Sequence, residues 1–440
     1  MNPLRLTQIA LALAATLVGA AQAQSLSELY ESARGYDATY LSARLQFDAN
    51  LAKSDQARAL LLPQAGLSAA VTRSSLDNST PHISYPFGSQ SAALSASQPL
   101  YRPQNLSSYN QSLKQIEQSQ AQLLAAEQDL IVRVSQAYFD ALTAKDNLTF
   151  VAAQKAAVAE QLAAAKRNFE VGTTTITDQR EAQASYDLVL AQEIAASNDL
   201  RIKLLALDQV VGKVATAPKS LQLPVLLPAL VPDDQSAWVQ QALDHHPGIK
   251  QAQLALDVAR LETEKAQAGH KPTLDLVASY NVANNDGGSS NGPGSTRNNV
   301  ATVGVQFNLP LFTGFSVQNR VRETLALEDK ARTDLEGARR AVTQATRTAF
   351  YGVQSGASQV KAYEAAEASS QSALDANKLG YQVGVRINID VLNSQSQLFD
   401  TKAKLAKARY DVLTGGLKLR QANGTLSADD LNAVSALLAR

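Results

Sequence analysis

The sequence predicts an α+β membrane protein in which each chain repeats one pattern of long helices and short strand pairs. Three observations support this fold class. The chain matches itself at an offset of about 210 residues. Two very long stretches consist mainly of good helix formers, with little Pro or Gly. Two pairs of shorter segments alternate apolar with polar or small residues and carry little charge.

The internal repeat extends over almost the whole chain after the N-terminal segment. Leu29-x-x-x-Ala33 recurs as Trp238-x-x-x-Ala242, and Asp178 recurs as Asp390. Phe169-Glu170-Val171-Gly172 recurs as Tyr381-Gln382-Val383-Gly384. A fixed long period of this kind predicts a duplicated gene and a protomer with pseudo-twofold symmetry.

Composition sets the expected domain boundaries. Arg5, an Ala-rich apolar run and Ala21-Gln22-Ala23 are typical of an export signal with its cleavage site. Regular prolines between the repeats exclude a continuous helix there, and we interpret this stretch as a linker, either packed or a disordered spacer. We expect a signal peptide at 1–23, repeats at 24–214 and 236–424, a linker at 215–235 and a C-terminal segment at 425–440.

Several classes of protein are disfavoured by composition. Forty basic and forty acidic residues cancel, which gives no electrostatic case for binding nucleic acid. There is no cysteine, so we expect neither disulfides nor a lipid anchor on a mature N-terminal Cys. No stretch after the signal segment is long and apolar enough for a transmembrane helix.

Each repeat is expected to begin with a helix and to end with a long helical hairpin. The first helices are predicted at about 25–60 and 236–268, and the hairpins at 103–211 and 315–421. The first arm of the first hairpin would run from about Pro103 to Phe169, roughly 100 Å at 1.5 Å per residue. Gly172 would end that arm, and Thr177 with Asp178 would cap the next helix.

Strand pairs are predicted at 64–100 and 272–310, between the first helix and the hairpin of each repeat. We expect strands of about ten residues, long enough to cross a membrane at a tilt, joined by loops at 74–89 and 284–299. Four strands cannot close a barrel, and an open edge is not tolerated in lipid. Three chains together would supply a 12-stranded β-barrel and twelve helical passes. Because the helix seams are rich in Ala, we favour a hollow cylinder over a solid coiled-coil bundle.

At this point the pattern resembles the TolC family of outer-membrane efflux and secretion channels, over essentially the whole mature chain. The duplicated order of elements carries the resemblance, together with the turn segments 171–178 and 381–392. The stretch Gly269–Leu276 is also close to the protein that gives the family its name. The resemblance implies a homotrimer in the Gram-negative outer membrane, with its β-barrel continuous with a 12-helix α-barrel in the periplasm. It further implies that a periplasmic adaptor and an inner-membrane transporter of the ABC, RND or MFS type open the channel.

The resemblance also implies roles for residues at the periplasmic tip of the hairpins. Positions that match the links holding the closed state are Thr177, Asp178, Tyr381 and Arg386. Turns that match the adaptor-docking grooves contain Val171, Gly172, Val383 and Gly384. Asp390 matches the first aspartate of the aperture, whereas Asn393 stands where the family has a second one.

Other functions have weaker support. His245-His246-Pro247 lacks the Cys or the spaced carboxylates of a metal site, so we expect ordinary surface residues and no metal. No motif of an enzyme or a cofactor site is found. The transported substrates stay open between small molecules and proteins. The alternative from another class is a trimeric coiled-coil, adhesin-like surface protein without a conducting lumen.

The departure at Asn393 predicts a weaker aperture charge. Three copies of Asp390 would form a ring of about three carboxylates, which favours cations and can bind a blocking polyvalent cation. We expect weaker cation selectivity and weaker block by trivalent cations than in a ring with two aspartates per chain. The reversal potential in a salt gradient measures the selectivity; if it survived Asp390→Ala, the assignment of Asp390 would be wrong.

Overall fold

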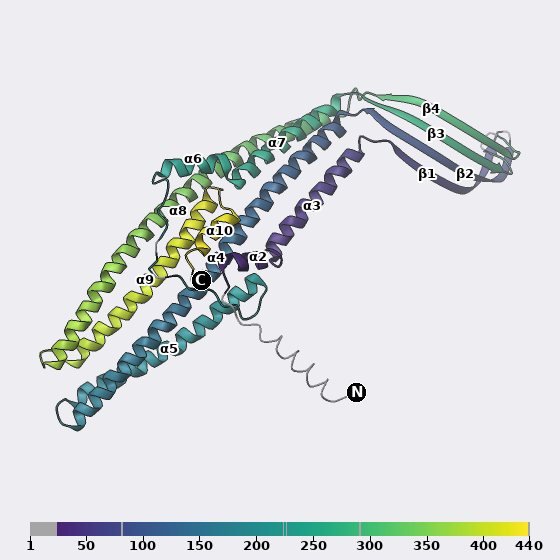
Figure 1. Ribbon diagram of the computed structural model, residues 1–440. Coiled ribbons are helices and arrows are strands. Elements are labelled where there is room, and N and C mark those ends of the chain that lie inside the picture. Colours follow the sequence, from purple (N-terminus) through teal and green to yellow (C-terminus); the bar gives the residue numbers. More distant parts are fainter. Residues whose placement is uncertain (1–23, 81, 223, 226, 290–291, 439–440) are drawn as a thin grey trace, which may run out of the picture. The chain divides into compact units, whose positions relative to one another are not determined.

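The computed structural model describes residues 24–80, 82–222, 224–225, 227–289 and 292–438 (Figure 1). The expected signal peptide therefore lies outside the described residues. The helices are α2 (Leu26–Arg34), α3 (Ala38–Ala59), α4 (Pro103–Glu170), α5 (Ile176–Val211), α6 (Gln235–His245), α7 (Pro247–Gln267), the 3-10 turn η1 (Ala268–His270), α8 (Ser316–Gln382), α9 (Asn388–Ala422) and α10 (Ala428–Ser435). The strands are β1 (Gln64–Ser79), β2 (His82–Tyr101), β3 (Thr273–Asp286) and β4 (Thr296–Asn308).

The two long helices begin and end close to where composition places them. Helix α4 has 68 residues, begins at Pro103, and contains no other Pro and no Gly. Proline suits the first helical position because its missing N–H has no intrahelical partner there. Helix α8 has 67 residues. Both helices end just before a left-handed glycine, Gly172 with φ +77° and Gly384 with φ +79°.

The predicted first helix of each repeat is instead broken in two. Helix α2 ends at Arg34, and Gly35 satisfies its last carbonyls before α3 begins. In the second repeat, α6 ends at His245, and Pro247 opens α7. Proline cannot continue a helix that precedes it, because it has no N–H and its ring clashes with the preceding turn. Trp238 of α6 is buried and packs with Phe350 and Leu419.

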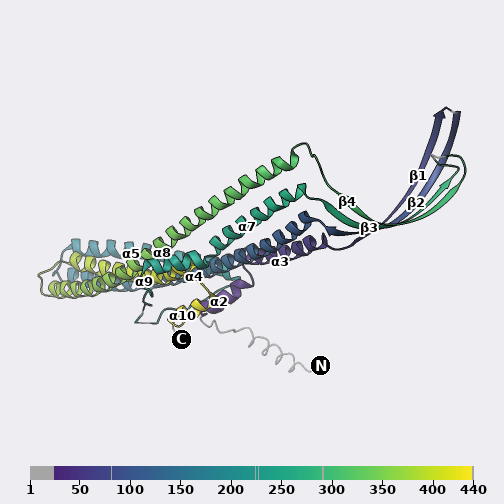
Figure 2. The ribbon, with the colours of Figure 1, turned by 90° about the horizontal axis from the view of Figure 1, so that it is seen from above.

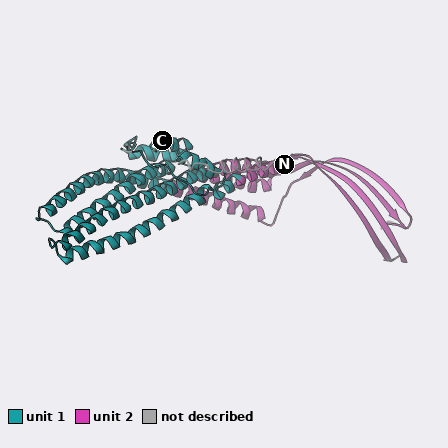
Figure 3. Cartoon of the chain, turned by 60° about the horizontal axis from the view of Figure 1, so that its bottom comes forward, with its two compact units in different colours: residues 1–44, 123–249, 339–440 teal, residues 45–122, 250–338 magenta. Residues whose placement is uncertain are grey.

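The chain divides into two compact units (Figure 3). Unit 1 comprises residues 1–44, 123–249 and 339–440, and unit 2 comprises residues 45–122 and 250–338. The main core of unit 1 lies around Tyr138, Phe139 and Tyr410, where the rings of Phe139 and Tyr410 are 5.6 Å apart. Leu26 and Leu29 of α2 are fully buried in this core.

Helices of unit 2 meet through small and polar side chains rather than through a thick apolar core. The hydroxyl oxygens of Ser54 in α3 and Ser112 in α4 lie 3.0 Å apart and are buried. The Gln111 amide of α4 donates to the Glu262 carboxylate of α7 over 3.1 Å. Small contact residues allow helices to approach side by side, as expected for a thin helical layer.

The four strands form one antiparallel sheet in the order β1-β2-β3-β4, and they lie side by side in two perpendicular views (Figure 1; Figure 2). The first pair is longer than predicted, because residues 74–89 do not form a loop. Ser74 pairs with Phe87 and Asp77 with Ser84, so the chain turns only between Ser79 and His82. Apolar Leu76, Ile83 and Tyr85 lie in this added part, on the face opposite to that of Leu67 and Leu94, so they are out of phase with the apolar alternation nearer the helices. The second connection is also shorter than predicted, from 287 to 295.

Register divides the sheet into an apolar and a polar face. Leu67 pairs with Leu94, which pairs with Tyr280, so all three side chains share a face. Ser95, Ser279 and Thr302 form a row on the opposite face. On β3 the apolar set runs from Leu274 to Val282, about 27 Å along the strand, or about 20 Å of bilayer at the usual tilt. One face therefore suits hydrocarbon, and the other suits water.

The outer edges of this sheet are unpaired in the described chain. β1 pairs only with β2, and β4 pairs only with β3. Among the described residues, no helix is long and apolar enough to cross a bilayer.

Val303→Arg should impair insertion into lipid, whereas Thr302→Arg should not. Val303 is 77% exposed on the apolar face, and its neighbour Thr302 lies on the polar face. An arginine facing hydrocarbon near mid-depth costs about 2–4 kcal/mol. Refolding yield into lipid vesicles, compared between the two variants, checks the assignment. Equal yields would contradict the division of faces.

Candidate functional site: the tips of the two helical hairpins

The tip of the first hairpin is organised by a capping box. Thr175 is the N-cap of α5, and its hydroxyl accepts from the Asp178 N–H over 3.3 Å. The N–H and the hydroxyl of Thr175 donate to Asp178 Oδ2 over 3.1 and 3.0 Å. The expectation that Thr177 and Asp178 cap this helix is therefore corrected. Thr175 holds the N-cap position, Asp178 completes the box three residues later, and Thr177 contributes only a hydroxyl 2.9 Å from that of Thr175.

The tip of the second hairpin is closed mainly by its backbone. The Val385 and Arg386 N–H groups both donate to the Gly380 carbonyl, over 2.8 and 3.1 Å. A Cβ on Gly380 would lie 2.7 Å from Arg386 Cγ, so this glycine makes room for the arginine stem. Ile387 is the N-cap of α9 and provides no side-chain hydrogen bond.

Asn388, at the first position of α9, joins the two tips. Its side chain is fully buried. Its Oδ1 accepts from Gln161 Nε2 of α4, and its Nδ2 donates to the Asp178 carbonyl over 3.2 Å. One amide therefore holds α9 against both helices of the other hairpin. The sequence interpretation missed this residue, although a lone polar side chain between Ile387 and Ile389 was an available signal.

The structure places Tyr381 and Arg386 beside a groove between the tips. The groove, of about 730 Å³, is also lined by Asp178, Thr174 and Asn388. The Tyr381 ring packs against Leu374, Val391 and Leu398, and its hydroxyl is buried without a hydrogen-bond partner. Arg386 pairs with Asp390, one turn later, over 3.6 Å. Within one chain, neither side chain is hydrogen-bonded to Thr177 or Asp178.

The other predicted tip residues are accessible. Val171 and Val383 are exposed, and a Cβ at Gly172 or Gly384 would meet nothing within 4 Å. Asp390 lies in the first turn of α9, and Asn393 is exposed on the same helix. Further apolar side chains are exposed at the two tips: Ile176, Val385 and Ile387.

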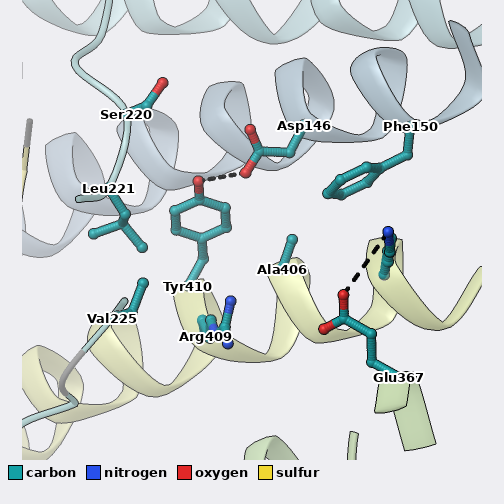
Figure 4. Close-up of a pocket in the computed structure, with 10 residues that line it drawn as sticks. Asp146, Phe150, Ser220, Leu221, Val225, Glu367, Ala406, Arg409 and Tyr410 are labelled. Atoms are coloured by element: carbon teal, nitrogen blue, oxygen red, sulfur yellow. Dashed lines mark hydrogen bonds and ion pairs between the residues drawn. The ribbon is translucent and has the colours of Figure 1, made fainter. Parts of the chain in front are cut away.

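A second polar contact joins the hairpins farther from the tips. Tyr410 of α9 donates to Asp146 of α4 over 2.6 Å, beside a cavity of about 330 Å³ (Figure 4). Leu221 and Val225, from the Pro-rich segment between the repeats, line the same cavity. Burial raises the pKa of the Asp146 carboxyl, although the Tyr410 hydrogen bond acts in the opposite direction. Asp146 and Gln161 are separated by about 22 Å along α4, so the hairpins are joined at two heights.

No group of three or more residues that could hold a metal ion occurs in the described part of the chain. The tips are built from helix ends, hydroxyl groups and the carboxylates of Asp178 and Asp390.

Comparisons with known proteins fit this architecture. The family described as outer membrane efflux protein matches residues 29–213 and 238–425, which correspond to the two repeats. The outer membrane protein TolC of Vibrio cholerae is 34% identical over 421 residues, covering 96% of this chain and 95% of that protein. The alkaline protease secretion protein AprF of Pseudomonas aeruginosa is 33% identical over 359 residues, covering 80% of this chain and 73% of AprF. The CmeC outer membrane channel of Campylobacter jejuni has a TM-score of 0.79 at 16% identity, covering 95% of this chain and 91% of CmeC.

Fold and site thus define a channel built from paired helical hairpins and a sheet with a lipid-compatible face. The chain belongs to the outer membrane efflux protein family, within its TolC branch. It is an efflux and secretion channel of the Gram-negative outer membrane that extends into the periplasm. Members of this family are transport proteins and not enzymes, and membership implies a homotrimer. The predicted fold class is confirmed.

Asn388→Ala should loosen the two tips. It leaves the Gln161 amide and the Asp178 carbonyl without their buried partner, at a cost of about 1–3 kcal/mol. Backbone amide hydrogen exchange at residues 173–179 and 385–390 should become faster. Asn393→Ala is the matched control, because Asn393 is exposed on the same helix. Unchanged exchange in Asn388→Ala would show that this amide does not hold the tips together.

Proposed function

We propose that contacts between the hairpin tips hold this channel closed at rest, and that a periplasmic adaptor with an inner-membrane transporter opens it. The observation that carries the proposal is the groove between the tips, with a buried and unpartnered Tyr381 hydroxyl on its wall. A buried hydroxyl without a partner costs about 1–3 kcal/mol, so a nearby acceptor would be strongly favoured.

Asp178 supplies a suitable acceptor on the other side of that groove. Both hydrogen bonds from Thr175 use Asp178 Oδ2. No hydrogen bond to Oδ1 occurs in the part of the chain that is described. We assign Oδ1 as the acceptor for the Tyr381 hydroxyl in the closed trimer, and Thr177 as the partner of Arg386. A small movement of the second tip would be enough to make or break these links.

Arg386 connects closure with the charge of the aperture. Its ion pair with Asp390 is largely exposed, so it contributes little to stability. It does place one positive charge beside each carboxylate of the proposed aperture ring. When Arg386 turns toward Thr177, or is removed, Asp390 is left to attract cations.

The exposed side chains at the tips provide a surface for the adaptor, and the names of the relatives indicate the classes of transported substrate. The exposed apolar side chains around Val171 and Val383 provide a surface on which an adaptor can bury area. The transporter is of the ABC, RND or MFS type. AprF is named for the secretion of alkaline protease, and the matching family for efflux. We propose that the channel exports small molecules, proteins or both.

The double variant Tyr381→Phe/Arg386→Ser should conduct better than the wild type. It removes the proposed donors to Asp178 and Thr177, and it removes the positive charge closest to Asp390. Single-channel recording in a planar bilayer should show a small wild-type conductance, a clearly larger one in the variant, and a reversal potential shifted toward cations.

The control is Tyr351→Phe/Arg347→Ser, which changes the same residue types on α8 away from the tip. It should behave as the wild type does. Equal and large conductance in all three proteins would agree with a channel but refute the proposed roles of Tyr381 and Arg386 in closing it. Absence of conductance in all of them would contradict the proposed duct.

A further inference from the structure

The sheet of unit 2 carries two basic side chains, and both lie on its apolar face. Within the four strands as described, Arg73 of β1 and Arg297 of β4 are the only Arg or Lys residues. Arg73 lies six residues after Leu67, and Arg297 lies four residues before Ala301, which pairs with Tyr280. Alternate residues of a strand share a face, so both arginines are on the same face as Leu67 and Tyr280.

Both arginines lie toward the end of the sheet that is away from the helices. α3 ends at Ala59, shortly before β1 begins, and α4 begins at Pro103, shortly after β2 ends, so the helices of unit 2 join the opposite end. The channel lies in the Gram-negative outer membrane and extends into the periplasm. Since the sheet is the part that suits hydrocarbon, its helical end faces the periplasm and its free end reaches the outer leaflet.

Each arginine stands just beyond the apolar band of its own strand. On β1 this band ends with Val71, which is 81% exposed, and Arg73 is the next residue on the same face. On β4 the band ends with Ala301, and Asn299 separates it from Arg297. At the usual tilt, the two backbone positions are about 5 and 10 Å beyond the hydrocarbon. A flexible arginine stem covers this difference, so both charges reach the headgroup layer, which is about 5–8 Å thick.

Neither arginine is neutralised within its own chain. Both are exposed, and in the part of the chain that the structure describes neither side chain forms an ion pair or a hydrogen bond. Two carboxylates share the face. Asp77 lies four residues farther from the hydrocarbon than Arg73, and the Asp286 Oδ1 accepts from the Ser295 hydroxyl over 3.2 Å. The charge of both arginines is therefore available to an anion.

Closure of the barrel brings the two arginines together from different copies. Within one chain, β2 and β3 separate β1 from β4, so the two strands that carry the arginines are about 14 Å apart. The unpaired edges are β1 and β4, so a closed barrel pairs β4 of one copy with β1 of the next, about 4.8 Å away. A cyclic rotation has no shift along its axis, so each arginine keeps its level. Arg73 therefore approaches Arg297 of the partner subunit.

We propose that Arg73 and Arg297 of the partner subunit bind one phosphate of the glycolipid that forms the outer leaflet, and this rests on the proposed trimeric channel. A guanidinium group stays charged and presents a planar fork of donors that matches phosphate oxygens. Two like charges side by side repel each other, and an anion between them removes that repulsion. One trimer contains three such seams between β4 and β1, and therefore three sites.

The apolar side chains next to the arginines suit the acyl chains of the same lipid. Leu67 of β1 and Val303 and Val305 of β4 are 78%, 77% and 60% exposed on the apolar face. They belong to the two edge strands, so they flank the same seam as the arginines. A phosphorylated lipid contacts both the arginines and this apolar strip, whereas a free phosphate ion contacts only the arginines.

Lipid A, the bisphosphorylated and acylated disaccharide of the outer leaflet, is the probe that tests the site. Native mass spectrometry of the purified full-length protein in detergent, titrated with lipid A, should show three tightly bound molecules per wild-type trimer. Arg73→Gln/Arg297→Gln should bind lipid A about 30-fold more weakly. The matched control is Arg322→Gln/Arg347→Gln, which removes two exposed charges from α8 and should bind as the wild type does.

The phosphate and the lipid class are tested with the same protein. Lipid A without its phosphates, and phosphatidylglycerol, should both bind the wild type much more weakly than lipid A does. Equally tight binding of dephosphorylated lipid A would overturn the phosphate site, and equally tight binding of phosphatidylglycerol would overturn the choice of glycolipid.

Stoichiometry tests whether the two arginines share one ligand. Six lipids per trimer, with half of them lost in each single variant, would overturn the shared site, and so would wild-type binding by Arg73→Gln/Arg297→Gln. The same spectra report the assembly. A trimer that binds no lipid A would refute the lipid site but leave the channel intact, whereas a monomer in every sample would refute both.

Discussion

The open edges of the protomer are the constraint on which the rest of the structure depends. β1 and β4 each carry a row of backbone N–H and C=O groups that no strand of the described chain satisfies. In hydrocarbon, each such group without a partner costs several kcal/mol, so the apolar face of this sheet can enter a bilayer only after closure with other copies. Four strands from each of three copies complete a barrel of a size known for bacterial outer-membrane proteins. Assembly of the copies and insertion of the sheet into the membrane are therefore energetically coupled.

The same constraint governs the helices. A 68-residue helix cannot bury its surface against a compact core, and α4 and α8 instead contact neighbours side by side along their length. Small residues at these contacts keep the layer thin. Polar contacts such as Gln111–Glu262, Tyr410–Asp146 and Asn388–Gln161 fix the relative position of adjacent helices. A layer of this kind leaves room for a lumen, and gating is proposed at its tips.

Features with a strong local signal could be predicted from the sequence. Pro103, Gly172 and Gly384 mark helix ends through backbone geometry that few other residues satisfy, and the structure has them there. The duplication made the glycine signal appear twice, at Gly172 and at Gly384. The break at Gly35 was missed because one glycine in a helical pattern is tolerated as often as it ends a helix. The full length of β1 and β2 was missed because Ser and Asn are common both in turns and on the wet face of a sheet. The role of Asn388 depends on Gln161 and on the Asp178 carbonyl, more than 200 residues away along the chain. No local pattern predicts such a contact.

The central claim is that three copies close around an empty axis, and cryo-electron microscopy of the purified protein in lipid nanodiscs tests it most directly. We predict a threefold particle with twelve strands in the membrane, and twelve helices around a solvent-filled lumen in projection along the axis. A particle whose axis is filled with packed side chains would instead support the solid coiled-coil alternative. A stable particle with β1 and β4 unpaired in lipid would contradict the claim that the sheet enters a bilayer only after its edges pair with other copies.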